Sequence, residues 1–487
     1  MIGPSASLYL GTGTEGPLWA GAEQSVLVLG PPRSGKTSGI VVPTVLAASG
    51  AVVSTSTKPD VLAATLPYRA RVGECLVFDP SGTVDVPDGA RPVGWSPVPA
   101  CTRWDDALLM ARALVGAGRT AGTGSATADH WTERAEALLA PLLHAAALSG
   151  ERLPELLSWV DRRQAAAALR VLDDAGHHVA GDLLAGIVAT EAREQSGIWS
   201  TASGVLAGYR SDAALASTVE NGVNAVEFCN SRSTLYVCAT GRHQALVAPM
   251  VVGLLTEIRA AAYHEHARAR RHEGPAGGAP ARAPVVLALD EVANIAPIPD
   301  LPFMVSEGGG QGLLTLACLQ DLSQAKGRWG AAAEGFLSLF GTTVVLPGIG
   351  DVRTLQALSA LAGEEEVATR SVSAPAMAGG WAAVASRLAG RGRIAAAVPT
   401  VTVGTRQQPR LAVDALGRGR PGMALVIDER NCMGWVRLTP WFAAEPWRTM
   451  VLGRERALPG GPGWTAREGL GRGRDTIDGG LAGGAAP

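Results

Sequence analysis

Short apolar runs, separated by polar or helical stretches, recur along most of this chain. Before about residue 100, three such runs predict strands, at 25–29, 51–54 and 75–78. After about residue 230 the runs resume and predict strands at 234–239, 285–289, 313–318, 342–346 and 424–427. Strands that alternate with helical segments are typical of a mostly parallel sheet covered by helices. The pattern therefore predicts an α/β fold.

The apolar spacing changes in the middle of the chain, where few strand-like runs occur. Segments 133–148, 153–172 and 179–194 are rich in Ala and Leu at helical spacing, which predicts an inserted all-α domain. We therefore divide the chain into a first core part at 20–102, the all-α domain at 103–230, a second core part at 231–453 and a disordered tail at 454–487. Composition further predicts a mobile loop at 116–129, a surface excursion at 265–284 and an insert of undefined structure at 373–399.

Composition narrows the classes of function. The 487 residues are 47% apolar and 18% charged, which predicts a globular chain of several domains. The net charge of −2 gives no overall basic character, so contact with DNA would need a local positive surface. The six cysteines have no C-x-x-C spacing, and most of them read as small buried residues. The longest apolar runs, 40–48 and 246–255, are short and contain a proline, so we expect a cytosolic chain without a transmembrane segment.

The first predicted strand runs directly into a phosphate-binding pattern, G-x-x-x-x-G-K-[ST]. Its residues are Gly30, Pro31, Pro32, Arg33, Ser34, Gly35, Lys36 and Thr37, with Ser38 next, and a helix is expected from there to about Pro43. Glycines let the backbone wrap around phosphates so that N–H groups point inward. In such a loop Lys36 reaches the β- and γ-phosphates, and the Thr37 hydroxyl binds Mg²⁺. The loop therefore predicts a site for ATP and Mg²⁺.

A second acidic site is expected at the end of another strand. The apolar run 285–289 is followed by Asp290 and Glu291, which suit a metal-holding carboxylate and a general base for the attacking water. The next predicted strand ends at Gln320. Because parallel strands present their carboxyl ends at one edge, we expect Gln320 beside Asp290, where its amide orients water or senses the γ-phosphate. An ordinary exposed glutamine is the alternative. Lys58 and Asp60, at another strand end, are weaker candidates for a nucleotide or subunit contact.

Several segments, in order along residues 20–448, resemble the TraG/TraD-like coupling proteins of conjugative type IV secretion systems. The most specific is the stretch 289–299, LDEVANIAPIP, followed downstream by 319–324, LQDLSQ. Segments 52–60, VVSTSTKPD, and 78–80 with 94–97, FDP and GWSP, add weaker likeness, as does 196–202 in the helical region. The resemblance implies a RecA-like P-loop ATPase with a helical cap, in which residues 290–409 correspond to the TraM-recognition region.

The family's function is what the resemblance implies for this chain. Such motors form hexameric rings at the inner face of the membrane, bring DNA with its relaxase to the channel components, and drive transfer by ATP hydrolysis. Two departures stand out. Members commonly carry N-terminal transmembrane helices, whereas about 24 residues precede the first predicted strand here. Many also have an arginine where this chain reads GGGQG at 308–312, which leaves Arg353 and Arg370 as replacements.

Two other functions remain open at this point. The chain could be a P-loop ATPase that moves or recruits protein in a secretion system, because nothing in its composition favours DNA. It could also be an adaptor that binds nucleotide without hydrolysing it, as the absent arginine suggests.

Overall fold

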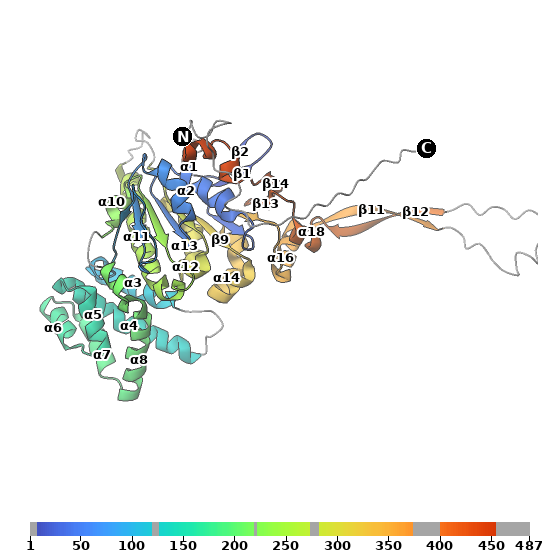
Figure 1. The fold of residues 1–487 in the computed structure, drawn as a ribbon. Helices are drawn as coiled ribbons and strands as arrows, with labels where there is room; N and C mark the ends of the chain where they lie inside the picture. The colour runs from blue at the N-terminus through green and yellow to red at the C-terminus, as the bar shows by residue number, and fades with distance from the viewer. Residues whose placement is uncertain (1–6, 119–125, 219–221, 273–281, 374–399, 454–487) are drawn as a thin grey trace, which may run out of the picture.

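A twelve-stranded sheet forms the centre of the molecule (Figure 1). The computed structural model describes residues 7–118, 126–218, 222–272, 282–373 and 400–453. The order of the strands is β2-β1-β14-β13-β10-β3-β9-β8-β4-β7-β5-β6, and the block from β10 to β6 is parallel throughout. The parallel strands are β10 (Thr342–Val345), β3 (Val26–Leu29), β9 (Leu313–Leu319), β8 (Val285–Leu289), β4 (Val52–Ser56), β7 (Thr234–Cys238), β5 (Cys75–Phe78) and β6 (Arg91–Pro92).

The predicted mostly parallel α/β sheet is confirmed, and all eight predicted strands are present within a few residues of their expected bounds. Four strands of this sheet were not predicted: β6, and the antiparallel β1 (Tyr9–Thr12), β2 (Pro17–Trp19) and β14 (Met433–Arg437), the last beside β13 (Met423–Ile427). They have two to five residues each, and β2, β6 and β14 contain exposed positions, so none of the four gives a long apolar run. Starting the core at residue 20 therefore omits part of the sheet. The boundaries at 103 and 230 stay predictions.

The two faces of the sheet lie against different hydrophobic cores, because successive side chains of a strand point to opposite sides. In β3, Leu27 and Leu29 belong to one core, whereas Val26 and Val28 belong to the other. The second core is covered by η1 (Thr37–Val41), α1 (Val42–Ala47), α2 (Asp60–Arg69) and α19 (Trp447–Leu452). The first is covered by α3 (Trp104–Ala117), α11 (Gln244–His272), α12 (Val292–Ile295), α13 (Leu301–Glu307) and α14 (Leu322–Trp329), and it continues into the all-α domain.

The all-α domain lies beside this first face (Figure 1). Its helices are α4 (Ala126–Ser149), α5 (Leu153–Asp161), α6 (Ala166–Asp174), α7 (His178–Val188), α8 (Ala192–Val205), α9 (Asp212–Ala216) and α10 (Ala225–Cys229). The helical segments predicted at 153–172 and 179–194 are each divided in two. Arg163 has a left-handed backbone with φ of 54°, which separates α5 from α6. The predicted loop at 116–129 is shorter than expected, because α3 and α4 extend into it and only 119–125 lie outside the described residues.

Helix α11 corrects two expectations. It continues through Pro249, and it extends to His272 into the predicted surface excursion. Residues Gln244–Arg271 are long and apolar enough to cross a membrane by length and composition. However, 61% of the most apolar window is buried inside the protein, where the helix packs on α3 and α10. This burial is typical of a core helix. Likewise, the helix after the phosphate loop continues past Pro43, which lies in the first turn of α1 where a missing N–H costs no bond.

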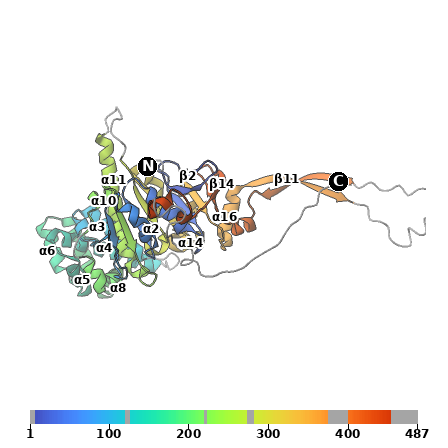
Figure 2. The same ribbon diagram turned by 45° about the horizontal axis from the view of Figure 1, so that its top comes forward.

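Strands β11 (Glu364–Ser373) and β12 (Thr400–Pro409) form a separate antiparallel ribbon that extends from the sheet near α16 (Val352–Ala362) and α18 (Val413–Arg418) (Figure 1 and Figure 2). Most of the predicted insert at 373–399, and the predicted disordered tail at 454–487, lie outside the described residues. The short helix α15 (Phe336–Leu339) and the single turns η2 (Pro99–Cys101), η3 (Ala207–Arg210), η4 (Gly309–Gln311), η5 (Gly330–Gly335) and η6 (Trp441–Ala443) complete the elements.

Candidate nucleotide site

The loop after β3 has the backbone of a phosphate-binding turn. Gly35 and Arg33 both have positive φ, 96° and 66°. A Cβ on Gly30 would lie 2.7 Å from the Ser34 hydroxyl and 2.9 Å from the Leu346 Cβ, so only glycine fits there. The chain then enters a π-helical turn directly after Lys36. Such turns are rare in proteins, and those that occur are often found at functional sites.

One buried polar side chain of this loop has no hydrogen-bond partner among the residues that the structure describes, and another bonds only to the loop itself. The Lys36 ammonium is buried and donates to the carbonyl oxygens of Gly30 and, at 3.0 Å, of Pro31. The Ser34 hydroxyl is buried and makes no hydrogen bond within the described part of the chain. A buried polar group without a partner costs free energy, and an anion in the loop would supply the acceptor. These residues therefore fit a phosphate group.

The acidic pair lies against the loop, although it is distant in sequence. The Thr37 hydroxyl donates to Asp290 Oδ2 at 2.7 Å, and the Thr55 hydroxyl at the end of β4 donates to the Asp290 carbonyl at 3.2 Å. Thr55 was not among the predicted residues. The adjacent Ser-Thr-Ser-Thr run at a strand end was a weak signal for it. A hydroxyl and a carboxylate within hydrogen-bond distance are the oxygen ligands that Mg²⁺ takes beside phosphates, so Thr37 and Asp290 fit that ion.

Burial is the main influence on the Asp290 carboxyl. It raises the pKa of Asp290 above its ordinary range, while the Thr37 hydrogen bond and the nearby Lys36 charge lower it in part. A carboxylate that is costly to ionise gains most from a neighbouring cation. The electrostatics therefore favour a divalent cation between Asp290 and the loop.

Glu291 has an unusual backbone. Its φ of 53° and ψ of 49° are left-handed, and it directly precedes α12. For a residue other than glycine this conformation costs about 1 kcal/mol, and such strain gathers at functional sites. Glu291 is partly exposed at the carboxyl edge of the sheet, next to buried Asp290. Its role as a base stays a prediction, with which a position at the carboxyl edge is compatible.

Strand β9 lies between the two halves of the site. It pairs with β3 on one side and with β8 on the other, with Leu319 opposite Leu29 and Ala317 opposite Leu289. Gln320 is consequently level with Gly30, and Asp290 is level with Cys318. The sequence predicted Gln320 at this edge but not that its strand separates the loop from the acidic pair. The Gln320 backbone N–H donates to Gln324 Oε1 at 2.8 Å.

The absence of an arginine at position 309, where many of the similar proteins have one, has a steric explanation. A Cβ on Gly309 would lie 1.6 Å from the Glu23 carbonyl oxygen, so no side chain fits at that position. Gly309 also lies before β9, at the amino edge of the sheet. Of the two replacements, Arg353 is exposed in the first turn of α16, whereas the side chain of Arg370 in β11 is not among those described. Lys58 is exposed just beyond β4.

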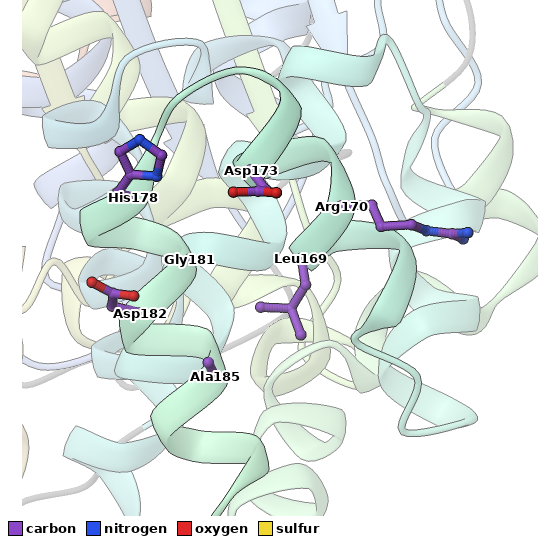
Figure 3. Close-up of a pocket in the computed structure, with 7 residues that line it drawn as sticks. All are labelled: Leu169, Arg170, Asp173, His178, Gly181, Asp182 and Ala185. Carbon is purple, nitrogen blue, oxygen red and sulfur yellow. The ribbon is translucent and has the colours of Figure 1, made fainter.

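Two surface hollows lie away from the loop. One, of about 340 Å³, lies between α6 and α7 of the all-α domain, with Asp173 on α6 and His178 and Asp182 on α7 along it (Figure 3). The other, of about 460 Å³, lies at the base of the ribbon between α16 and α18. Neither contains a residue of the phosphate loop or the acidic pair.

Comparison with known proteins supports this assignment of the fold. Residues 284–391 match the family model described as the TraM recognition site of TraD and TraG. The conjugative coupling protein TrwB, in an unbound form lacking its N-terminal segment, shares the fold with a TM-score of 0.60 and 17% identity, over 86% of this chain and 85% of that one. TrwB with a non-hydrolysable ATP analogue gives 0.61 and 16%, over 86% of each chain. TrwB with ADP and Mg²⁺ gives 0.59 and 17%, over 86% and 85%. No curated protein matches.

The fold and the site define a class, the P-loop NTPases with a RecA-like core, here with an inserted all-α domain. Within that class the chain is TraG/TraD-like: residues 284–391 match the TraM-recognition model and the fold is similar to that of TrwB, which confirms the resemblance predicted from the sequence.

Proposed function

We propose that this chain is an ATP-hydrolysing coupling protein that recruits DNA with its relaxase and drives it into a type IV secretion channel. The observation that carries the proposal is the 2.7 Å hydrogen bond between Thr37 and Asp290, which joins the phosphate loop to the acidic pair across β9. In this proposal the backbone of Gly30–Ser38 cradles the phosphates of ATP, and Lys36 leaves its loop carbonyls to bind them. TrwB, of the same fold, has been obtained with an ATP analogue and with ADP and Mg²⁺.

The roles in hydrolysis follow from the chemistry of each group. Thr37 and Asp290 hold Mg²⁺, which neutralises charge on the phosphates when bound. Glu291 accepts a proton from the attacking water, and its left-handed backbone sets the direction in which its side chain leaves the main chain. Gln320, level with Gly30, orients that water or senses the γ-phosphate.

The partners follow from the TraM-recognition match and the likeness to TrwB. We propose a homo-hexamer at the inner face of the cell membrane, assembled with relaxosome proteins and channel components.

One experiment separates this function from its rivals: the ATPase rate against protein concentration, at several salt concentrations, with and without DNA. A motor gives a rate per subunit that rises with concentration and with DNA, with the DNA effect falling steeply as salt rises. Stimulation by a protein partner but not by DNA supports the protein-moving ATPase. Binding of ATP without turnover at any concentration supports the adaptor, which the lack of room at Gly309 favours.

A further inference from the structure

Arg33 has a backbone conformation that its side chain does not favour. Among the described residues, positive φ occurs at fourteen glycines and at only five other residues: Glu23, Arg33, Arg163, Glu291 and Asn431. Glycine adopts this conformation without steric cost, and this chain uses it for that purpose in most places. The left-handed turn therefore does not by itself explain an arginine at position 33, and we expect the reason in the chemistry of the arginine side chain.

That side chain is an exposed cation of the phosphate loop. Arg33 is exposed, and no ion pair or side-chain hydrogen bond of the described residues involves its guanidinium. The other cation of the loop, Lys36, is buried and held by loop carbonyls. The loop thus has one buried cation that is bonded to the loop itself and one cation that is open to solvent.

An exposed arginine in this loop suits the stabilisation of negative charge on a γ-phosphate. Transfer of a γ-phosphoryl group places charge on its three outer oxygens, and an arginine supplied by the same chain or by a neighbour can stabilise it. The planar guanidinium matches two phosphate oxygens at once, which an ammonium does not. In this chain Gly309 has no room for an arginine, and that position lies at the opposite edge of the sheet from the loop.

We propose that Arg33 is a catalytic residue that binds the γ-phosphate of the nucleotide held by its own loop. The proposal rests on the proposed nucleotide function and adds that the arginine acts within one subunit. Arg33 then distinguishes ATP from ADP, because only ATP has the group that it contacts.

The test compares Arg33→Gly with Arg163→Gly. Each replaces an exposed, left-handed arginine by the residue that best tolerates that backbone, and Arg163 lies in the all-α domain with only a Ser196 contact at 3.2 Å. For each variant and the original protein, the measurements are the affinities for ADP and for a non-hydrolysable ATP analogue with Mg²⁺, and the rate of ATP turnover. Arg33→Lys tests whether charge alone suffices.

Arg33→Gly should lose about tenfold or more in affinity for the ATP analogue while its affinity for ADP is unchanged, since a charge-assisted bidentate contact is lost. Its turnover should fall by roughly 10³-fold, as for other arginines that contact the transferring group. Arg33→Lys should recover only part of the turnover, and Arg163→Gly should match the original protein in all three measurements.

Three results would overturn the proposal. Equal losses for ADP and the analogue would move the contact away from the γ-phosphate. Unchanged binding and turnover in Arg33→Gly would remove Arg33 from the site altogether. Turnover restored by mixing Arg33→Gly with Lys36→Ala would show that the arginine acts on a neighbouring subunit. If the original protein bound neither nucleotide, the proposed function would fail and this proposal with it. Binding without turnover would leave the affinity ratio as the decisive readout.

Discussion

A cation is buried at each of the two edges of the parallel sheet, and the two cations differ in how they are hydrogen-bonded. At the amino edge Arg69 is completely buried and every part of its guanidinium has a partner. It donates to Thr234 Oγ1 at 2.7 Å, and to the carbonyl oxygens of Ala48 at 2.9 Å, Arg232 at 2.8 Å and Gly50 at 3.2 Å. These contacts join the ends of α1 and α2 to the starts of β4 and β7.

At the carboxyl edge the buried polar groups are left incompletely satisfied. Ser34 has no partner among the described residues, Lys36 bonds only to carbonyls of its own loop, and burial raises the pKa of Asp290. Arg33, next to Ser34, and Glu291, next to Asp290, also have left-handed backbones. A buried cation whose hydrogen bonds are all made within the fold contributes to stability, whereas a buried cation beside an unpaired hydroxyl and a buried carboxyl suits a ligand. The two cations thus differ in what their surroundings leave to be bound.

The largest effect expected from this contrast is at Lys36. Lys36→Ala removes the cation that binds the β- and γ-phosphates, so ATP turnover should fall by on the order of 10³-fold or more. The free energy of unfolding should change little, because the lost hydrogen bonds lie within one loop. A coupled assay measures the loss of turnover, and denaturant unfolding measures the free energy of unfolding. A folded variant with normal turnover would exclude the loop as the ATP site.

The next effect is at the base. Glu291→Gln keeps the shape of the side chain but cannot accept a proton, so turnover should fall by about 10²- to 10³-fold while ATP binding persists. Radiolabelled ATP should therefore remain intact on the variant after gel filtration. Unchanged turnover would assign the base to another residue.

Arg69 tests the opposite edge. Arg69→Met leaves buried carbonyls without a donor, which should lower the free energy of unfolding by about 3 kcal/mol. Arg71→Met, at an exposed arginine two residues on, should cost less than about 1 kcal/mol. Urea unfolding measures both. In the folded fraction ATP affinity should be normal, and a specific loss of ATP affinity in Arg69→Met would contradict the division between the edges.

The smallest effect concerns pH. Because the pKa of Asp290 is raised in the folded state, the native protein binds its proton more tightly than the unfolded chain does. The free energy of unfolding of the nucleotide-free protein therefore falls as pH rises from the ordinary aspartate pKa through the raised one. Asp290→Asn should lack this component, so its stability relative to the original protein should rise with pH in that window. A constant difference in urea unfolding from pH 4 to 8 would show that Asp290 is not penalised by burial.

Much of this arrangement follows from the sequence, for physical reasons that also set the limit. The phosphate loop and the Asp290–Glu291 pair are contiguous patterns with fixed chemistry, and buried parallel strands such as β3 and β8 are continuous apolar runs. The position of β9 between them depends on long-range pairing, which no local pattern encodes. Arg69 likewise looks like any arginine near a helix end until its four partners converge on it.

Other features depend on backbone conformation rather than residue type. The left-handed φ of Arg33, Arg163 and Glu291 could not be predicted from residue type, because neither arginine nor glutamate favours that conformation. The exclusion of a side chain at Gly309 comes from a contact with Glu23, which is distant in sequence. Strands β1 and β14 are held by pairing with each other, and β14 also pairs with β13, so neither is formed by its composition alone.

The most direct test is an experimental structure with Mg²⁺ and a non-hydrolysable ATP analogue. We expect the phosphates within the loop from Gly30 to Thr37, the metal on the Thr37 hydroxyl near Asp290, and the Lys36 ammonium turned from the loop carbonyls to the phosphates. Nucleotide bound elsewhere, for example in the hollow between α6 and α7, with this loop unchanged, would contradict the account.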